Sequence, residues 1–405
     1  MRTAGFMINR GIQSFDAFKG RPYFDALDGL RGISILLVLL HHTQRFQPGF
    51  IRTLQENGRY GVALFFVISG FLICTLLLRE EEVTGKIDLW KFYGRRALRL
   101  LPLYYAVLLL QAVMVFCLKQ YTPENQALFI DKLPAYLLYY SNWLATASEG
   151  PFFQAWSLAV EEQFYIAFGL LLFFAHRRLV LAALFAALAV KITVYQLFGA
   201  LDAGSAVWRV IFSYREPILY GVLAAFALNQ RTCYEAFQRR LNSKWTVAIL
   251  GVAITAWLCR HPMQHESFLD AQLLYLLMTL LVVGLVVQPA IPLLGGRFLT
   301  HVGKISYGIY LMHMFVISAV RKLPGGTSPF FCFVLSSAAA IFVASLVYQF
   351  FERPIIAFYK KRFSPLNSAI ADNLVPPEPV PASAGVRPSP IAPLNSEMPR
   401  DGYTA

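Results

Sequence analysis

Ten long apolar stretches run through the chain, and stretches of this length leave few possible folds. They lie at about residues 27–46, 60–78, 100–118, 156–175, 179–199, 210–228, 245–259, 269–288, 305–320 and 330–351. Because a helix rises about 1.5 Å per residue, about 20 apolar residues cross the hydrocarbon core of a bilayer. Only 15% of the residues are charged, against about 25% in a typical soluble protein. The sequence therefore predicts an all-α fold, a polytopic membrane helix bundle with about ten transmembrane helices.

The basic residues between these stretches indicate how the chain is oriented. With the N-terminus in the cytoplasm, the connecting segments on that side hold 24 of the 36 Lys and Arg residues, and the opposite segments hold eight. This bias follows the positive-inside rule, and ten crossings then place both termini in the cytoplasm. These short clusters explain the net charge of +13. We therefore expect membrane lipids, and no nucleic acid, as partners.

The two ends of the chain differ from its apolar part. Residues 1–22 are expected to form a cytoplasmic leader, because they are basic but hold no short apolar core with a cleavage site. Residues 23–360 form the predicted integral-membrane domain. Residues 364–405 are rich in proline without apolar periodicity, which predicts a disordered cytoplasmic tail. Within the domain, the aromatic segment 133–143 is too short to span a bilayer, so we expect a re-entrant or interfacial piece on the outer side.

The first apolar stretch carries ionisable residues, which a membrane helix normally excludes. On a helix, Asp28, Arg31 and His42 share one stripe, with a rise of about 16 Å between Arg31 and His42. Ionisable groups inside a membrane are costly unless they are paired or serve a site. His42 is therefore a candidate general base, and Arg31 either pairs with Asp28 or holds an anionic donor such as a phosphate. His41 points about 100° away from this stripe.

Three arginines precede the third apolar stretch on the side expected to be cytoplasmic. Arg96 and Arg99 lie three residues apart and so share one helix face, and Arg95 lies beside them. Such a cluster sets the orientation of the helix, binds the phosphates of a donor, or does both.

The fourth stretch opens with the run WSLAVEEQFY. It puts two carboxylates, Glu161 and Glu162, into an otherwise apolar helix, and Glu161 shares a side with Ser157. Trp156 and Ser157 are candidate substrate contacts. Glu161 is expected to orient His42 or to bind a sugar hydroxyl.

The ninth stretch opens with the run SYGIYLMH. Tyr307, Tyr310 and His313 are spaced so that they spread along one broad helix face that looks into the bundle. We include all three among the candidate substrate-binding residues, and core packing is the alternative role for the two tyrosines.

Five motifs, taken in their order along the chain, resemble those of membrane acyltransferase family 3, which includes bacterial O-antigen and Nod-factor O-acetyltransferases. The motifs are Arg31 and His42 with ten residues between them, Arg96-x-x-Arg99 followed by Pro102, Tyr104 and Tyr105, Trp156-Ser157-Leu158-x-x-Glu161-x-x-Phe164-Tyr165, Ser306-Tyr307-x-x-Tyr310-Leu311-x-His313, and Glu352-Arg353-Pro354. The resemblance covers about residues 23–360 and implies ten core helices, in agreement with the loop charges.

The resemblance implies a membrane-bound O-acyltransferase of the bacterial inner membrane. Such an enzyme transfers an acyl group, usually acetyl from acetyl-CoA, to a hydroxyl of an O-antigen, exopolysaccharide or glycolipid precursor. The family's catalytic histidine maps to His42, its essential arginine to Arg31, and its donor-side pair to Arg96 and Arg99. Many members add a periplasmic hydrolase-like domain. The expectation here is that this chain lacks one and acts on a lipid-linked or small glycan.

Several alternatives stay open. His42 either deprotonates the sugar hydroxyl for direct attack on the thioester or carries the acyl group itself. On physics alone, the buried charges also suit a proton-coupled transporter or a glycolipid flippase, and a non-catalytic scaffold is a third alternative. The five cysteines lie singly, so no metal site is expected. The identity of the acceptor and the oligomeric state are not predicted.

Overall fold

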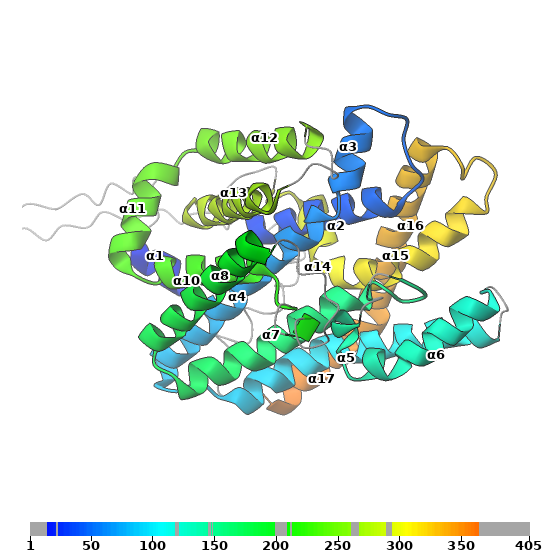
Figure 1. The fold of residues 1–405 in the computed structure, drawn as a ribbon. Helices are drawn as coiled ribbons and strands as arrows, with labels where there is room; N and C mark the ends of the chain where they lie inside the picture. Colours follow the sequence, from blue (N-terminus) through cyan, green and yellow to red (C-terminus); the bar gives the residue numbers. More distant parts are fainter. Residues whose placement is uncertain are drawn as a thin grey trace, which may run out of the picture.

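The computed structural model of the chain is built from helices. It describes residues 14–21, 23–117, 121–144, 147, 149–198, 209–210, 213–260, 267–288 and 294–363, with the backbone alone for 359–363. No strand occurs in these residues. The helices (Figure 1) are α1 (Phe15–Gly20), α2 (Asp25–His42), α3 (Phe50–Asn57), α4 (Tyr60–Thr84), α5 (Leu89–Phe116), α6 (Pro123–Leu137), the 3-10 turn η1 (Ser141–Trp143), α7 (Ala155–Phe174), α8 (Arg177–Phe198), α10 (Glu216–Leu228), α11 (Arg231–Leu241), α12 (Lys244–Arg260), α13 (Phe268–Val287), α14 (Arg297–Lys304), α15 (Ser306–Arg321), α16 (Pro329–Val347), the π-helical turn η3 (Tyr348–Glu352) and α17 (Arg353–Phe363).

Within the described residues, six helices are long and apolar enough to cross a membrane, namely α4, α5, α7, α8, α13 and the continuous helix that starts with α16. The number rises to eight if each of two bent pairs forms one span. These pairs are α11 with α12, bent by 80°, and α14 with α15, bent by 77°. The prediction of a helical, multi-pass membrane protein is thereby confirmed for the described residues, whereas the predicted number of ten spans stays a prediction.

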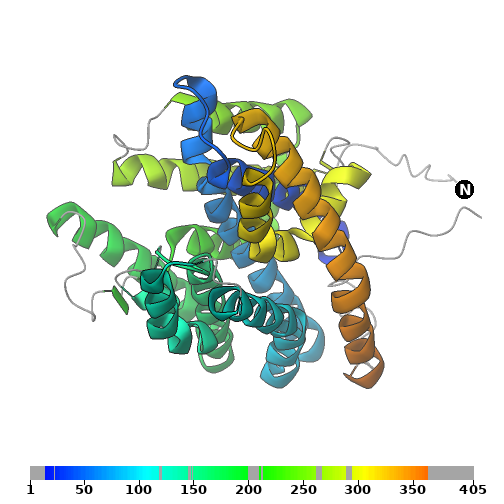
Figure 2. The same cartoon turned by 90° about the vertical axis from the view of Figure 1, so that its right-hand side faces the viewer.

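Each of the ten predicted stretches contains a helix, although the bounds of some helices differ from the predicted ones. α2 ends at His42 rather than at residue 46, because Thr43 has an extended backbone. α10 begins only at Glu216, since Pro217 in its first turn favours a helix start at this point. The last stretch does not stop at the predicted boundary but continues through η3 into α17, which makes one long helix (orange in Figure 2). Segment 133–143 divides between the end of α6 and η1.

The expected leader contains α1, which is fixed to the rest of the protein. Arg79 of α4 donates hydrogen bonds of 2.7 Å to the carbonyl oxygens of Phe18 and Arg21. The Phe18 ring stacks on Tyr234 of α11 at 5.0 Å. α1 and α11 therefore lie together at one end of the molecule (Figure 1). The predicted disordered tail, 364–405, lies outside the described residues.

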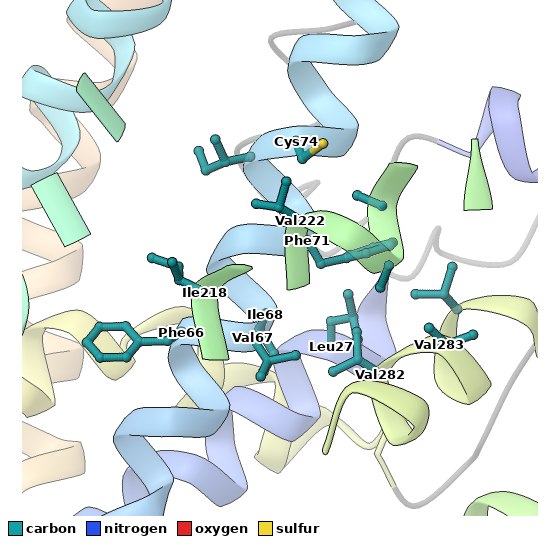
Figure 3. Close-up of a cluster of buried hydrophobic side chains, with 14 of the residues drawn as sticks. Leu27, Phe66, Val67, Ile68, Phe71, Cys74, Ile218, Val222, Val282 and Val283 are labelled. Atoms are coloured by element: carbon teal, nitrogen blue, oxygen red, sulfur yellow. The ribbon is translucent and has the colours of Figure 1, made fainter. Parts of the chain in front are cut away.

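The hydrophobic core lies where α2, α4, α10 and α13 meet (Figure 3). Its side chains include Leu27, Val67, Ile68, Phe71, Ile218, Val222, Val282 and Val283. α4 and α10 approach each other so closely that a Cβ atom on Gly70 would lie 2.1 Å from the carbonyl oxygen of Ile218. A Cβ atom on Gly221 would lie equally close to that of Val67. Small residues permit such backbone contact between membrane helices.

α2 is central, since other elements hold both of its ends. Near its N-terminal end, α14 packs directly on its backbone, and a Cβ atom on Gly303 would lie 1.8 Å from the carbonyl oxygen of Asp28. Near its C-terminal end, α3 lies across the helix, between α2 and α12 (Figure 1). Both ends of α2 are therefore fixed in the bundle.

Candidate active site

The two ends of α2 organise the candidate site. Asp28 and Arg31 lie near its N-terminal end, whereas His41 and His42 lie in its last turn. Other helices add polar side chains at both ends, which gives two groups separated by about 16 Å of helix rise. We call these groups the histidine cluster, formed by His41, His42 and His313, and the arginine cluster, formed by Arg31, Arg96 and Arg99. The arginine cluster includes the acidic residues within electrostatic range of these arginines, namely Asp28, Glu162 and Glu352.

His42 has one ring nitrogen engaged and one available. Its Nδ1 atom lies 2.9 Å from the carbonyl oxygen of Val38, one helical turn earlier. Because a carbonyl oxygen only accepts hydrogen bonds, Nδ1 must carry the proton of the neutral ring, and Nε2 carries the lone pair. His42 is half-buried. Its Nε2 atom is therefore suited to take a proton or to act as a nucleophile.

His313 of α15 lies against His42 and is fully buried. The two ring centroids are 4.9 Å apart, with an angle of 66° between the planes. The Nδ1 atom of His313 lies 2.5 Å from the carbonyl oxygen of Tyr310, so its Nε2 atom also carries a lone pair. That Nε2 atom has no hydrogen-bond partner in the described part of the chain. The sequence placed His313 among the substrate contacts, and the structure brings it to His42.

Tyr310 and Ser157 form a buried hydroxyl pair next to these rings. Their oxygens are 2.6 Å apart, and each hydroxyl also lies 3.2 Å from the carbonyl oxygen of Gln154. The Tyr310 ring lies 5.5 Å from that of His313, and Phe153 lies 5.7 Å from His42. The structure thus joins two motifs, on α7 and α15, beside the C-terminal end of α2.

The arginine cluster surrounds the other end of α2. The Nη2 atom of Arg31 donates to the Ser306 hydroxyl at 3.4 Å. Arg99 lies within electrostatic range of Arg31, Asp28 and Glu352. The predicted pairing of Arg31 with Asp28 is not seen, because no ion pair joins members of this cluster within the described residues.

Several polar atoms of the arginine cluster have no partner. Oδ2 of Asp28, Nε of Arg31 and Oε1 of Glu352 are buried and form no hydrogen bond within the part that the structure describes. η3 places Glu352 in the bundle interior, opposite the backbone of Gly308, where a Cβ atom would lie 3.4 Å from Oε1. π-helical turns of this kind occur frequently at functional sites.

Glu161 belongs to the arginine cluster's side of the molecule rather than to His42. It accepts hydrogen bonds from the hydroxyls of Ser69, at 2.5 Å, and Tyr165. The guanidinium of Arg96 lies over the Tyr165 ring, 4.8 Å from its centroid. The contacts of Glu161 therefore do not support the prediction that it orients His42.

The remaining predicted residues have other partners. Arg95 forms an ion pair of 2.8 Å with the buried Glu80, so its charge is neutralised within the protein. The Tyr307 hydroxyl donates to the carbonyl oxygen of Leu100 at 2.8 Å, which fixes α15 to α5. Trp156 packs under the guanidinium of Arg215, 5.0 Å away. These contacts join helices to one another. The ion pair with Glu80 also distinguishes Arg95 from Arg96 and Arg99, which form no ion pair within the described residues.

Some contributing residues, including Gln154, Ser69 and Glu352, were not predicted as site residues from the sequence. Gln154 and Ser69 are single polar residues beside or inside apolar runs, which gives no distinctive signal. Glu352 does stand in a recognised motif, but its position at the end of an apolar stretch suggested a boundary charge. Only the π-helical turn reveals that its carboxylate points inward.

The sequence has clear relatives. A family described as an acyltransferase domain matches residues 24–349. Putative O-acetyltransferase SACOL0978 of Staphylococcus aureus (strain COL) is 28% identical over 386 residues, and O-acetyltransferase OatA of Staphylococcus aureus (strain NCTC 8325 / PS 47) is 28% identical over 375 residues. These matches cover 88% and 86% of this chain, and the chain spans about 60% of the length of either relative. No solved structure gives a significant match. Because the family match extends over most of the sequence, the chain belongs to membrane acyltransferase family 3.

Proposed function

We propose that the chain transfers an acyl group, acetyl from acetyl-CoA, to a hydroxyl of a carbohydrate or lipid-linked glycan. One observation carries this proposal. A histidine with an available Nε2 atom lies at one end of α2, and arginines that form no ion pair within the described part of the chain lie at the other end. The family membership and the names of the relatives support acyl transfer as the reaction class.

In this proposal the protein is a multi-pass protein of the bacterial inner membrane, with ten crossings and both termini in the cytoplasm. The distribution of Lys and Arg residues supports that orientation. The arginine cluster then faces the cytoplasm, where acetyl-CoA is available. The histidine cluster faces the outer side, where the glycan acceptor is bound.

The arginine cluster is proposed to hold the donor. Arg96 and Arg99 bind phosphate groups of acetyl-CoA, since guanidinium groups match phosphate oxygens in charge and geometry. Arg31 lies between this group and His42 on the same helix. The pantetheine arm extends from the arginines along α2 towards His42 and presents the thioester there.

At the histidine cluster two routes fit the geometry. In direct transfer, Nε2 of His42 takes the hydroxyl proton, the oxygen attacks the thioester carbonyl, and the CoA thiolate leaves and receives that proton. In the covalent route, Nε2 attacks the thioester carbonyl, the C–S bond breaks, and CoA leaves as the thiolate, which gives an acyl-imidazolium that keeps the Nδ1 proton. The hydroxyl oxygen then attacks the acyl carbon, its proton passes to the CoA thiolate, and the bond to Nε2 breaks so that the neutral ring is restored. Both routes require the Nδ1 contact with Val38, which keeps the lone pair on Nε2.

The central experiment is replacement of His42. His42→Ala should reduce acetyl transfer from labelled acetyl-CoA by at least about 10²-fold, the usual contribution of a general base. The matched control is His176→Ala, because His176 is exposed in the turn between α7 and α8, far along the sequence from α2. Glycan O-acetylation in a deletion strain complemented with each variant gives the same comparison in cells. Normal acetylation with His42→Ala would remove His42 from the reaction.

The same assay separates the proposal from the alternatives. A proton-coupled transporter or flippase neither cleaves the thioester nor transfers the label, and a scaffold does not respond to His42→Ala. Release of free CoA by the purified protein, lost in His42→Ala and retained in His176→Ala, is therefore the expected signature of the acyltransferase.

A further inference from the structure

The last turn of α2 needs support from outside the helix. The final carbonyl groups of any helix have no partners within it, so helix ends tend to fray. In α2, this turn carries His42, and Thr43 directly after it is already extended. A catalytic group at such a place is held in position only if other parts of the chain engage the terminal carbonyl groups.

Gln55 of α3 engages the carbonyl group of Leu40 and those of the loop after α2 with a single buried side chain, while Arg321 of α15 donates to the carbonyl oxygen of His42 at 2.7 Å. Its Nε2 atom lies 3.1 Å from the carbonyl oxygen of Leu40, 3.4 Å from that of Thr43 and 2.9 Å from that of Gln44. Its Oε1 atom accepts a hydrogen bond of 3.0 Å from the backbone N–H of Phe46. Gln55 is only 2% exposed. Both halves of its amide therefore hold the end of α2 and the loop that follows.

His41 links the same glutamine to His42. Its Nδ1 atom donates to the backbone carbonyl oxygen of Gln55 at 3.0 Å. The His41 ring stands perpendicular to the His42 ring, with 4.8 Å between the centroids and 88° between the planes. His41 thus limits the movement of the His42 ring on one side, while His313 lies against it at 4.9 Å.

α3 is itself fixed in place, so that it can serve as a support. The side-chain amide of Asn57, which is fully buried, donates to the carbonyl oxygen of Leu258 in α12 at 2.8 Å. Gly58, which follows α3, touches α2 so closely that a Cβ atom would lie 2.4 Å from the carbonyl oxygen of Leu37. α3 therefore connects the end of α2 to α12, and close contacts hold it in place against both helices.

We propose that Gln55 and His41 are positioning residues for His42, together forming a clamp between α3 and the last turn of α2. The inference rests on the proposed function, in which Nε2 of His42 acts on the hydroxyl or the thioester. Neither Gln55 nor His41 needs to touch the substrate. Because a displacement of about 1 Å at a reacting group can cost about 10²-fold in rate, loss of the clamp lowers kcat.

Gln55→Glu tests the clamp directly, because glutamate keeps the shape of the side chain but lacks the two N–H donors. We expect kcat to fall by about 10-fold or more, with an unchanged KM for acetyl-CoA. Amide hydrogen exchange of residues 38–46 should become faster in the same variant. The matched control is Gln288→Glu, since Gln288 is also buried, at 5% exposure, and donates to the carbonyl oxygen of Leu241 at 3.2 Å beyond the end of α13. It should lower thermal stability to a similar extent and leave kcat unchanged.

A second pair of variants keeps the test decisive if Gln55→Glu does not fold. His41→Phe preserves the ring but removes the donor, so kcat should fall, whereas His41→Asn keeps a donor and should recover part of the rate. Equal kcat in wild type and His41→Phe, or equal losses in Gln55→Glu and Gln288→Glu, would overturn the clamp. Failure of the proposed function looks different, because the wild-type protein would then neither release CoA nor transfer the label, or His42→Ala would retain full acetyl transfer.

Discussion

The two ends of α2 differ in how their polar side chains are bonded. At the histidine cluster the groups are imidazoles, and each has its Nδ1 atom bonded to a backbone carbonyl oxygen. At the arginine cluster guanidinium groups lie near carboxyl groups, and no ion pair joins them within the described residues. The first arrangement fixes ring positions and tautomers. The second leaves guanidinium groups available for a ligand inside the helix bundle, where an unpaired charge is costly.

The contrast is sharper because the protein does pair buried charges elsewhere. Lys191 and Glu216 form an ion pair of 3.0 Å, and Arg95 and Glu80 form one of 2.8 Å. Unpaired charges in a membrane interior cost several kcal/mol each, so they persist where a ligand completes the site. The comparison therefore supports the proposal that the arginine end binds a ligand and the histidine end carries the reacting group.

The largest effect is expected from reversing charge at the arginine end. Arg96→Glu with Arg99→Glu should raise the KM for acetyl-CoA by at least about 10²-fold, because each hydrogen bond to a charged group contributes about 1.5–3 kcal/mol. Initial rates over a range of acetyl-CoA concentrations in purified protein measure this change.

Arg95→Gln is the matched control for that experiment, since it removes a neighbouring charge that Glu80 already neutralises. It should lower thermal stability and leave the KM for acetyl-CoA unchanged. If all three arginines had the same effect on KM, the distinction between paired and unpaired arginines would be wrong.

The next effect concerns the packing of α14 on α2. Gly303→Ala puts a methyl group where only 1.8 Å separates it from the carbonyl oxygen of Asp28, so α14 must move away. We expect a loss of stability of about 1–3 kcal/mol, typical of an overpacked contact, with a raised KM for acetyl-CoA. Gly94→Ala, on α5, is the control because its Cβ atom would meet nothing within 4 Å. Thermal unfolding in detergent compares the two, and equal melting temperatures would contradict the close approach.

Much of the fold could be predicted from the sequence, because a long apolar stretch is a strong indication of a membrane helix. All ten predicted stretches contain a helix, and the family was recognisable from five motifs. The short helix α10 and the two sharp bends were not predicted, since they depend on local breaks such as Pro217 and on tertiary packing. Apolar periodicity predicts that a segment is helical more reliably than it predicts the residue at which the helix ends.

The site was predictable by residue type but not by grouping. Helix geometry placed Asp28, Arg31 and His42 on one helix, yet it could not pair His42 with His313, which lies 271 positions later in the chain. It also could not show that Glu161 bonds to Ser69 and Tyr165. Contacts between helices depend on how the whole bundle packs, and spacing within one helix carries no information about that packing.

At the histidine end, His313→Ala should reduce kcat by about 10-fold and leave the KM for acetyl-CoA unchanged. The variant removes the ring that lies against His42 and leaves a cavity beside it, so His42 gains freedom. Steady-state kinetics separate the two parameters, and His301→Ala is a suitable control, since His301 is exposed on α14. A change confined to KM would instead place His313 in donor binding and would weaken the division between the two ends.

The smallest effect is expected for Tyr310→Phe, and it decides whether the hydroxyl pair beside the histidines reacts or only packs. The variant removes a hydrogen bond of 2.6 Å to Ser157, but Ser157 can still donate to the carbonyl oxygen of Gln154 at 3.2 Å. Since no buried group loses its last partner, the loss of stability should be about 1 kcal/mol and the fall in kcat less than about fivefold. Kinetics and thermal unfolding of the same preparation give both values. A fall in kcat of about 10²-fold at unchanged stability would mean that the Tyr310 hydroxyl contacts the reacting atoms, and the histidine cluster would then include Tyr310 of α15.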